Sequence, residues 1–279
     1  MSRLSDVVSR SLIVCYKEDI TELQDQLRLA GWEPSVLRGS YTPEELRHSS
    51  MTRCFLNHQN AWRIAANSKG YTLICEADFV PCKQIGTLPV FWPLNNPMAW
   101  GYLYQGSPRL LSVIGSEEFL RGHSASVAAY IINQPVAEIL LRFFDYEMAE
   151  YGSEEYFNWD AHLRWWAMGR GAEAYIPERH YGEHGGIPNP EHSKFKISRA
   201  GWHQADNLAR PLAFLPQYAK GSKVRFYIRR VEARALGWAR LLTGRWIVDT
   251  NVYSRDWKRT LLMQWIGIRR LLPRCLSRR

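Results

Sequence analysis

Two acids one residue apart, Glu76 and Asp78, are the residues of this chain whose type and spacing most directly suggest chemistry. They follow the uninterrupted apolar run at residues 73–75, which predicts a strand buried on both faces. Because side chains alternate along an extended chain, residues 76 and 78 point to the same side. Ligands of open α/β sheets bind at the carboxyl ends of strands, and carboxylate oxygens bind Mn²⁺ or Mg²⁺. We therefore predict a divalent cation on Glu76 and Asp78, the alternative being two acids that face water.

The segments around this pair predict an α/β domain. Residues 11–16 and 32–37 have the composition of strands, and residues 20–30 between them carry apolar side chains at helical spacing. This succession predicts a βαβ opening. Another helix is expected over residues 43–67, with a break near Ser49, directly before the strand that carries the two acids.

Aromatic residues mark the part of the chain after residue 81. Residues 82–97 are rich in Pro and Trp, which predicts a loop over a ligand more than a core element. Trp92, Trp100 and the pair Trp165-Trp166 are candidates for stacking on a sugar, with burial in the core as the alternative. The remaining expected elements are strands at 100–104, 110–114 and 172–176 and helices at 135–144 and 157–166.

Further candidate residues follow these elements. Asp160, near the start of a predicted helix, is a candidate general base, the alternative being a charge that complements the helix dipole. Residues 181–192 form a loop rich in His and Gly, where glycines permit close backbone approach. We include Glu183 as a second catalytic candidate and His184 as a third metal ligand. Zinc catalysis at this loop is not favoured, because no His-Glu-x-x-His sequence is present.

The predicted helix and strand resemble a segment of glycosyltransferase family 25, the lipopolysaccharide-core and collagen galactosyltransferases. That segment reads roughly Cys-Phe-x-Ser-His-x-x-x-Trp, followed by a strand that ends Glu-Asp-Asp-Val. The matching residues of this chain are Cys54, Phe55, His58, Trp62, Glu76, Asp78 and Val80. Asn57 stands in place of the serine and Ala77 in place of the middle acid. Shorter matches occur at residues 130–132 and at Asp160.

The resemblance covers about residues 11–195 in outline and implies an A-type, Rossmann-like glycosyltransferase domain, which we expect over residues 1–215. A basic amphipathic helical extension is expected over residues 216–279. The implied activity is inverting transfer of a hexose, galactose from UDP-galactose, to a lipopolysaccharide or other cell-surface glycan or glycolipid acceptor. Mn²⁺ or Mg²⁺ is the implied cofactor, and the implied donor-site residues are Asn57, His58, Glu76 and Tyr130. A catalytically silent glycan-binding or scaffold protein on the same fold stays open, because Ala77 replaces an acid.

The C-terminal part of the chain is strongly basic. Residues 223–279 hold 15 of the 36 lysines and arginines but 3 of the 27 acids, a net charge of +12 in a chain of net charge +9. Two helical stripes of apolar residues run through it: Val224, Ile228, Val231, Ala235, Trp238 and Leu242, then Trp257, Leu261, Trp265, Ile268 and Leu272. This pattern predicts helices that lie on an anionic membrane, the alternative being helices packed on the domain with a solvated basic face.

The sequence also argues against a nucleic acid partner, a membrane-spanning segment and a signal peptide. The basic residues of the C-terminal part alternate with large aliphatic ones, and no nucleic-acid-binding module is recognisable, so no nucleic acid partner is expected. The longest uncharged stretch of this part, residues 260–268, is far below the roughly 20 residues that span a bilayer. The short apolar run at residues 12–16 precedes charged residues, which predicts a strand and no signal peptide. We expect a cytoplasmic protein, peripheral on the inner face of the membrane.

Overall composition agrees with a folded protein. Hydrophobic residues make up 46% and aromatic residues 13% of the 279 residues, enough for a sizeable core. The five cysteines include no Cys-x-x-Cys pair, so neither a disulfide framework nor a zinc ribbon is expected.

Overall fold

The computed structural model describes residues 2–115, 119–153, 157–187, 204–247 and 257–273. Within these residues the centre is an eight-stranded sheet in the order β2-β1-β3-β8-β5-β9-β7-β6. Its strands are β1 (Val8–Cys15), β2 (Pro34–Arg38), β3 (Tyr71–Glu76), β5 (Ala99–Tyr102), β6 (Arg109–Ile114), β7 (Phe119–His123), β8 (Ala129–Asn133) and β9 (Glu173–Ile176). A second small sheet pairs β4 (Phe79–Pro81) with β10 (Gly182–His184).

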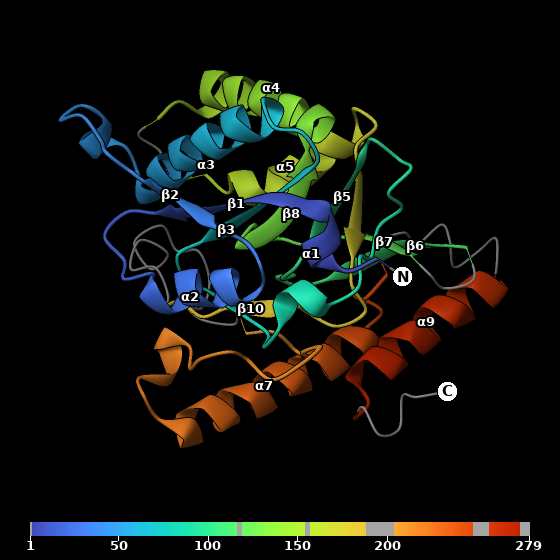
Figure 1. Ribbon diagram of the computed structural model, residues 1–279. Coiled ribbons are helices and arrows are strands. Elements are labelled where there is room, and N and C mark those ends of the chain that lie inside the picture. The colour runs from blue at the N-terminus through green and yellow to red at the C-terminus, as the bar shows by residue number, and fades with distance from the viewer. Residues whose placement is uncertain (1, 116–118, 154–156, 188–203, 248–256, 274–279) are drawn as a thin grey trace.

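Helices cover both faces of the central sheet (Figure 1). The α-helices are α1 (Leu4–Val7), α2 (Thr21–Leu29), α3 (Ser50–Ala66), α4 (Gln134–Tyr151), α5 (Trp159–Met168), α7 (Lys223–Leu242) and α9 (Trp257–Leu271). In Figure 1, α3, α4 and α5 lie above the sheet, whereas α2, α7 and α9 lie below it. Short 3₁₀ turns are η1 (Glu45–Arg47), η2 (Ile85–Thr87) and η3 (Gln217–Ala219). The α/β class predicted from the sequence is therefore confirmed.

The first strands are parallel and the rest of the sheet is mixed. β1 pairs in parallel with β2 on one side and with β3 on the other. β8 then runs antiparallel to both β3 and β5. The two strands that follow β1 in the chain therefore lie on opposite sides of it. The order of strands reverses at such a switch point, and open α/β sheets bind ligands there, beyond the carboxyl ends of the strands.

Burial on both faces explains the uninterrupted apolar run of β3. Ile74 packs in the cluster formed with α3, α4 and α5, whereas Leu73 and Cys75 pack in the cluster on the other face. The period of two residues in a strand assigns these opposite faces. Ser49 is the N-cap of α3, and its side chain accepts a hydrogen bond from the Thr52 amide. The predicted break before this helix is therefore confirmed.

The backbone of residues 82–97 is irregular, as predicted, but the segment packs into the core instead of lying over a ligand. Phe91 and Trp92 are buried in the core, and a Cβ at Gly101 of β5 would overlap the Phe91 ring. Trp100 is also buried, so neither Trp92 nor Trp100 is free to stack on a sugar. The irregular backbone misled the prediction, because this segment covers the sheet with aromatic rings and has no periodic pattern.

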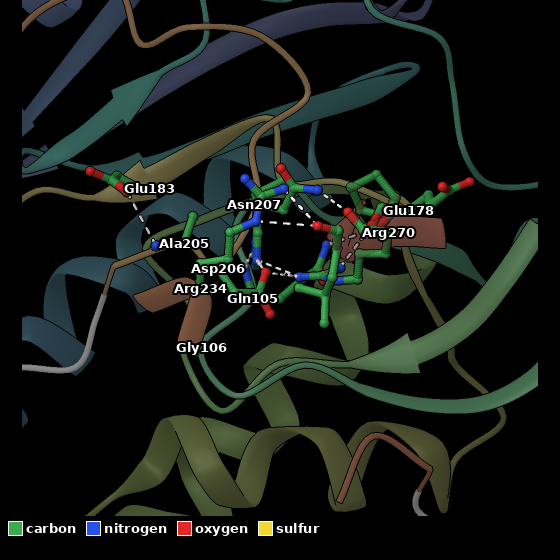
Figure 2. A network of polar contacts seen from close by, with 12 residues as sticks. Gln105, Gly106, Glu178, Glu183, Ala205, Asp206, Asn207, Arg234 and Arg270 are labelled. Carbon is green, nitrogen blue, oxygen red and sulfur yellow. Dashed lines mark hydrogen bonds and ion pairs between the residues drawn. The ribbon is translucent and has the colours of Figure 1, made fainter. Parts of the chain in front are cut away.

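The C-terminal helices are joined to the body of the protein by polar contacts and by packing. α7 contacts α9, and α9 contacts β6 of the central sheet. Arg270 of α9 reaches Asp206, Gln105 and the Glu178 carbonyl in a buried network (Figure 2). The domain boundary at residue 215 stays a prediction. Across the described ranges, no helix is long and apolar enough to cross a membrane.

The cysteines agree with the sequence analysis. Among the described residues, Cys15, Cys54, Cys75 and Cys82 form no disulfide bond. Cys275 lies outside the described residues, as do Glu191 and His192 of the predicted His-rich loop.

Candidate active site

The end of β3 and the turn after it place the two predicted acids. Glu76 follows Ile74 by two residues, so its side chain lies on the face covered by α3. The Ala77 amide donates to the Val14 carbonyl of β1, and the Gly185 amide donates to the Asp78 carbonyl, at 2.9 and 2.8 Å. These bonds fix the turn between β1 and β10, beyond the carboxyl ends of β1 and β3.

Glu76, Asp78 and His184 form a cluster of possible metal ligands. The His184 Nε2 atom lies 3.8 Å from Glu76 Oε2 and 3.3 Å from Asp78 Oδ2. Two atoms that are each ~2.1 Å from one ion lie roughly 3 to 4 Å apart, so this spacing suits a shared cation. Asp78 Oδ1 is buried and has no hydrogen-bond partner within the described part of the chain. The structure thus brings the three predicted ligands together, and their donor set fits Mn²⁺ or Mg²⁺.

A chain of buried side chains stands behind Glu76. The Trp62 indole donates to the Tyr130 hydroxyl at 2.7 Å, and that hydroxyl lies 2.8 Å from His58 Nδ1. His58 Nε2 lies 3.2 Å from Glu76 Oε1. A carboxylate only accepts, so a neutral His58 carries its proton on Nε2 and accepts the Tyr130 proton at Nδ1. Such support from behind orients a metal-binding carboxylate.

The electrostatics of Glu76 favour its charged form. Burial alone would raise its pKa, but the hydrogen bond from His58, and then the electrostatic interactions with His58 and His184, hold that pKa below its ordinary value. Cys54 donates to Glu76 Oε1 at 3.6 Å. Burial and the charge of Glu76 raise the pKa of the Cys54 thiol well above its ordinary value, so this thiol stays a donor. Glu76 is therefore ready to bind a cation near neutral pH.

The other predicted donor-site residues lie further from solvent than expected. His58 and Tyr130 are fully buried. His58 contacts Glu76, and Tyr130 contacts His58, so neither side chain faces a surface ligand. Asn57 donates through Nδ2 to the Cys15 and Leu37 carbonyls, at 2.9 and 3.1 Å, and so joins the ends of β1 and β2. Beside it lies a cavity of about 270 Å³ lined by Arg38, Gly39, Ser40, Tyr41, Glu45, Leu56, Asn57, Gln59, Asn60 and Arg63.

Gly186 is held against Asp78, and we predict that Gly186→Ala weakens metal binding. A Cβ at residue 186 would overlap Asp78 Oδ2 and come within 3.3 Å of the His184 ring. The added methyl group must displace the carboxylate although no ligand is removed. We expect Mn²⁺ affinity to fall roughly 10- to 100-fold, as for other residues that position ligands. Isothermal titration calorimetry measures it, and unchanged Mn²⁺ affinity in a folded variant contradicts the geometry.

Asp160 occupies the first turn of α5, close to the cluster. The ring of its neighbour Trp159 lies 5.1 Å from the His58 ring and stacks on Phe55 at 4.6 Å. Burial, and then the negative charge of Glu76, raise the pKa of Asp160 to about 7. A carboxyl group with a pKa near neutrality is suited to accept a proton during a reaction at that pH.

The titration of Asp160 gives a second prediction. In the metal-free protein its carboxyl is expected to titrate near pH 7, and Glu76→Gln is expected to lower that pKa by removing a nearby charge. The folded pKa lies above the ordinary value of 3.8, so deprotonation as the pH rises opposes folding. Asp160→Asn is therefore expected to be more stable than the parent above pH 7. NMR titration of the Asp160 carboxyl carbon measures the pKa, and thermal melting measures the stability. An ordinary pKa for Asp160 in the metal-free protein contradicts the prediction.

Glu183 is not part of the cluster. In β10 its side chain points to the face opposite His184, where it accepts from the Ala205 amide, the Tyr218 hydroxyl and Arg230. The Glu183 side chain is fully buried, and Arg230 Nη1 lies 2.7 Å from its Oε2. These contacts join β10 to α7, and we do not assign Glu183 a catalytic role.

The sequence left open two roles for His58, a donor-site residue or a hydrogen-bonded histidine near the core, and the structure shows the second. Cys54, His58 and Trp62 are spaced by four residues and therefore share one face of α3, a pattern that was visible before the structure. Trp62 donates a hydrogen bond to the Tyr130 hydroxyl, and Cys54 donates one to the Glu76 carboxylate. No sequence signal indicated that Arg230, far along the chain, pairs with Glu183.

Comparisons with known proteins give little independent information. No family model and no curated protein matches the chain. One solved structure that is similar in part is described as the crystal structure of a glycosyltransferase involved in the glycosylation of the major capsid of PBCV-1. It is 11% identical, the match covers 60% of this chain and 81% of that one, and the TM-score is 0.38. A likeness this weak carries no argument, so the resemblance to family 25 stays a prediction from short segments.

Proposed function

We propose that this chain is a metal-dependent inverting glycosyltransferase that moves a hexose from a nucleoside-diphosphate sugar to a glycan or glycolipid acceptor. The observation that supports the proposal most is the cluster of Glu76, Asp78 and His184 at the switch point of the sheet. Asp160, with a pKa of about 7, stands close to that cluster. The sequence segments favour galactose from UDP-galactose as the donor and lipopolysaccharide as the acceptor.

Each residue of the cluster has a distinct role in this proposal. Glu76, Asp78 and His184 hold Mn²⁺ or Mg²⁺, which when bound neutralises a diphosphate and stabilises the departing nucleotide. His58 orients the Glu76 carboxylate. Asp160 accepts the proton of the acceptor hydroxyl while that oxygen bonds to the anomeric carbon and the bond from this carbon to the phosphate oxygen breaks. Attack opposite the leaving group inverts the anomeric configuration.

The cavity beside Asn57 suits the nucleoside end of the donor. It is lined by polar side chains and two arginines, Arg38 and Arg63, at the ends of β2 and α3. β2 and β3 flank β1, so their ends lie about 10 Å apart. In a nucleotide sugar the diphosphate group lies between the nucleoside and the sugar. With the nucleoside in this cavity, the proposed position of the phosphates is therefore near the metal ligands.

A donor screen tests the proposal. The chain is melted with UDP-galactose, UDP-glucose and UDP-N-acetylglucosamine, with and without Mn²⁺. A ligand at 100 times its dissociation constant adds about 2.7 kcal/mol of stability, so we expect one donor to raise Tm by several degrees only when Mn²⁺ is present.

The controls separate the alternatives. Asp78→Asn is expected to abolish the Mn²⁺-dependent shift, because it removes a ligand charge. Donor binding without release of nucleotide in the presence of acceptor glycans indicates a catalytically silent glycan-binding protein. Equal stabilisation of the parent and Asp78→Asn by the donor rejects the metal site.

A further inference from the structure

Most of the apolar stripe of α7 faces away from the protein, although Trp238, one of its members, is partly buried against the core. Val224, Ile228 and Val231 are 70%, 54% and 70% exposed, and Leu242 at the end of the helix is 82% exposed. Their spacing places them along one side of the helix. Helices that pack on a domain bury their apolar side, so α7 has the reverse orientation.

Polar and small residues fix this orientation from the inner side of α7. Arg230 pairs with the buried Glu183, and the Arg234 guanidinium donates to the Leu271 carbonyl. A Cβ at Gly237 would meet both Asp206 and Leu271 at 2.9 Å, so the helix approaches the body closely there. Turning the apolar stripe inward would leave the Glu183 charge buried without Arg230, which is costly.

Helix α9 repeats the arrangement. Trp257, Leu261 and Trp265, at intervals of four residues, are 66%, 58% and 51% exposed. Its opposite side holds the buried residues Met263, Ile266 and Arg270. Figure 2 shows Arg270 directed into the body of the protein, where its network holds the helix in place. Tryptophan, with an apolar ring and a polar N–H group, suits the boundary between lipid and water.

Charge identifies the partner. Lys223, Arg225 and Arg229 are exposed beside the apolar stripe of α7. A stripe that is apolar at its centre and basic at its edges matches acyl chains below anionic headgroups. A second copy of the same chain would bring its own basic residues against these, and nucleic acid offers no counterpart for exposed valine and isoleucine.

We infer that the outward stripes of α7 and α9 dock onto an anionic phospholipid bilayer. This docking does not depend on the catalytic proposal. Arg230 joins α7 to Glu183, the residue before the metal-ligand candidate His184, so the docking helix and the site are held together. If the chain is a transferase, as proposed above, a lipid-linked glycan is the acceptor class that this arrangement serves.

Vesicle co-sedimentation of the full chain tests the inference. Phosphatidylcholine vesicles are compared with vesicles that also contain phosphatidylglycerol, and we expect binding to the anionic vesicles that weakens as salt is added. Val231→Asp is expected to weaken binding about tenfold or more, because burial of one such side chain is worth roughly that factor. Leu29→Asp is the matched control: Leu29 lies on α2, is 80% exposed and is expected to leave binding unchanged.

The opposite outcomes overturn the inference. They are equal binding by Val231→Asp and the parent, or equal binding to neutral vesicles. A dimer that dissociates on Val231→Asp indicates a second copy as the partner, and a DNA or RNA mobility shift lost in Val231→Asp indicates nucleic acid. The Mn²⁺-dependent donor shift is measured on the same variants, so failure of docking and failure of the transferase proposal are separate results.

Discussion

Replacing Arg270 with methionine is expected to lower the free energy of unfolding by about 3–5 kcal/mol, because Asp206 then stays buried without a counter-charge. Arg270 is 1% exposed, and its Nη2 atom lies 2.5 Å from Asp206 Oδ1. Its Nη1 atom donates to Gln105 Oε1 and to the Glu178 carbonyl, at 3.1 and 2.9 Å (Figure 2). Arg270 of α9 therefore pairs with a carboxylate and donates hydrogen bonds to two further oxygen atoms, and these three partners belong to three other segments of the chain.

His180 does not replace the missing charge. The Gln105 amide donates to His180 Nδ1, so the neutral ring carries its proton on Nε2 and donates to Asp206 at 2.9 Å. Burial, and then the charge of Arg270, lower the pKa of His180 to about 4. In the parent protein His180 is thus a neutral donor, and Arg270 supplies the positive charge.

The dependence on pH follows from Asp206. Burial alone would raise its pKa, but Arg270 and His180 hold it far below the ordinary value of 3.8. The stabilisation from the charged carboxylate is therefore complete above pH ~4 and is lost as the pH falls below that. In Arg270→Met the folded pKa of Asp206 rises, so the stability difference between the parent and the variant is expected to shrink in acid.

Urea unfolding measures the effect. Arg229→Met is the control, because the pair of Arg229 and Glu232 is exposed and worth at most about 1 kcal/mol. The double variant Arg270→Met with Asp206→Leu is expected to recover much of the loss, since it removes both charges. A loss in Arg270→Met no larger than in Arg229→Met would show that the buried network does not anchor α9.

The parts of the fold that could be predicted are those with a regular hydrophobic period. The run at Leu73, Ile74 and Cys75 predicted a doubly buried strand, and β3 is one. The break before α3 was visible at Ser49 because a serine cap leaves a local signal. Residues 82–97 gave no period, and their aromatic rings entered the core through contacts with β5 that local sequence does not encode.

The candidate metal ligands could be predicted from the sequence, but the role of Glu183 could not. Glu76 and Asp78 are neighbours in sequence, so the alternation of one strand places them. His184 was predicted as a third ligand from its His-rich loop, and it does lie beside the two acids. The Gly-rich sequence hid the short strand β10, however, so the pairing of Glu183 with Arg230 on the opposite face was not predicted. The helical stripe of α7 was likewise found from its period, whereas the side that faces inward depends on Arg230.

The largest functional effect is expected from Asp160→Asn, which should lower kcat for glycosyl transfer by about 10²- to 10⁴-fold, the usual contribution of a general base. Asparagine keeps the shape of the side chain but does not accept a proton at neutral pH. The cation ligands Glu76, Asp78 and His184 are untouched, so Mn²⁺-dependent donor binding should stay at the parent level. Asp78→Asn is expected to lose both properties.

The pH profile distinguishes a base from a structural carboxylate. Deprotonation of Asp160, with its pKa of about 7, should make kcat/KM of the parent rise with pH through that region. A bound divalent cation offsets the charge of Glu76, which is the second cause of the raised pKa, so the rise should fall at lower pH when Mn²⁺ is present. Asp160→Asn should lose the rise entirely. Asp145→Asn, an exposed substitution in α4, should keep both the rate and the profile. If Asp160→Asn transfers the sugar at the parent rate, Asp160 is not the general base, and the proposed inverting mechanism has no identified proton acceptor.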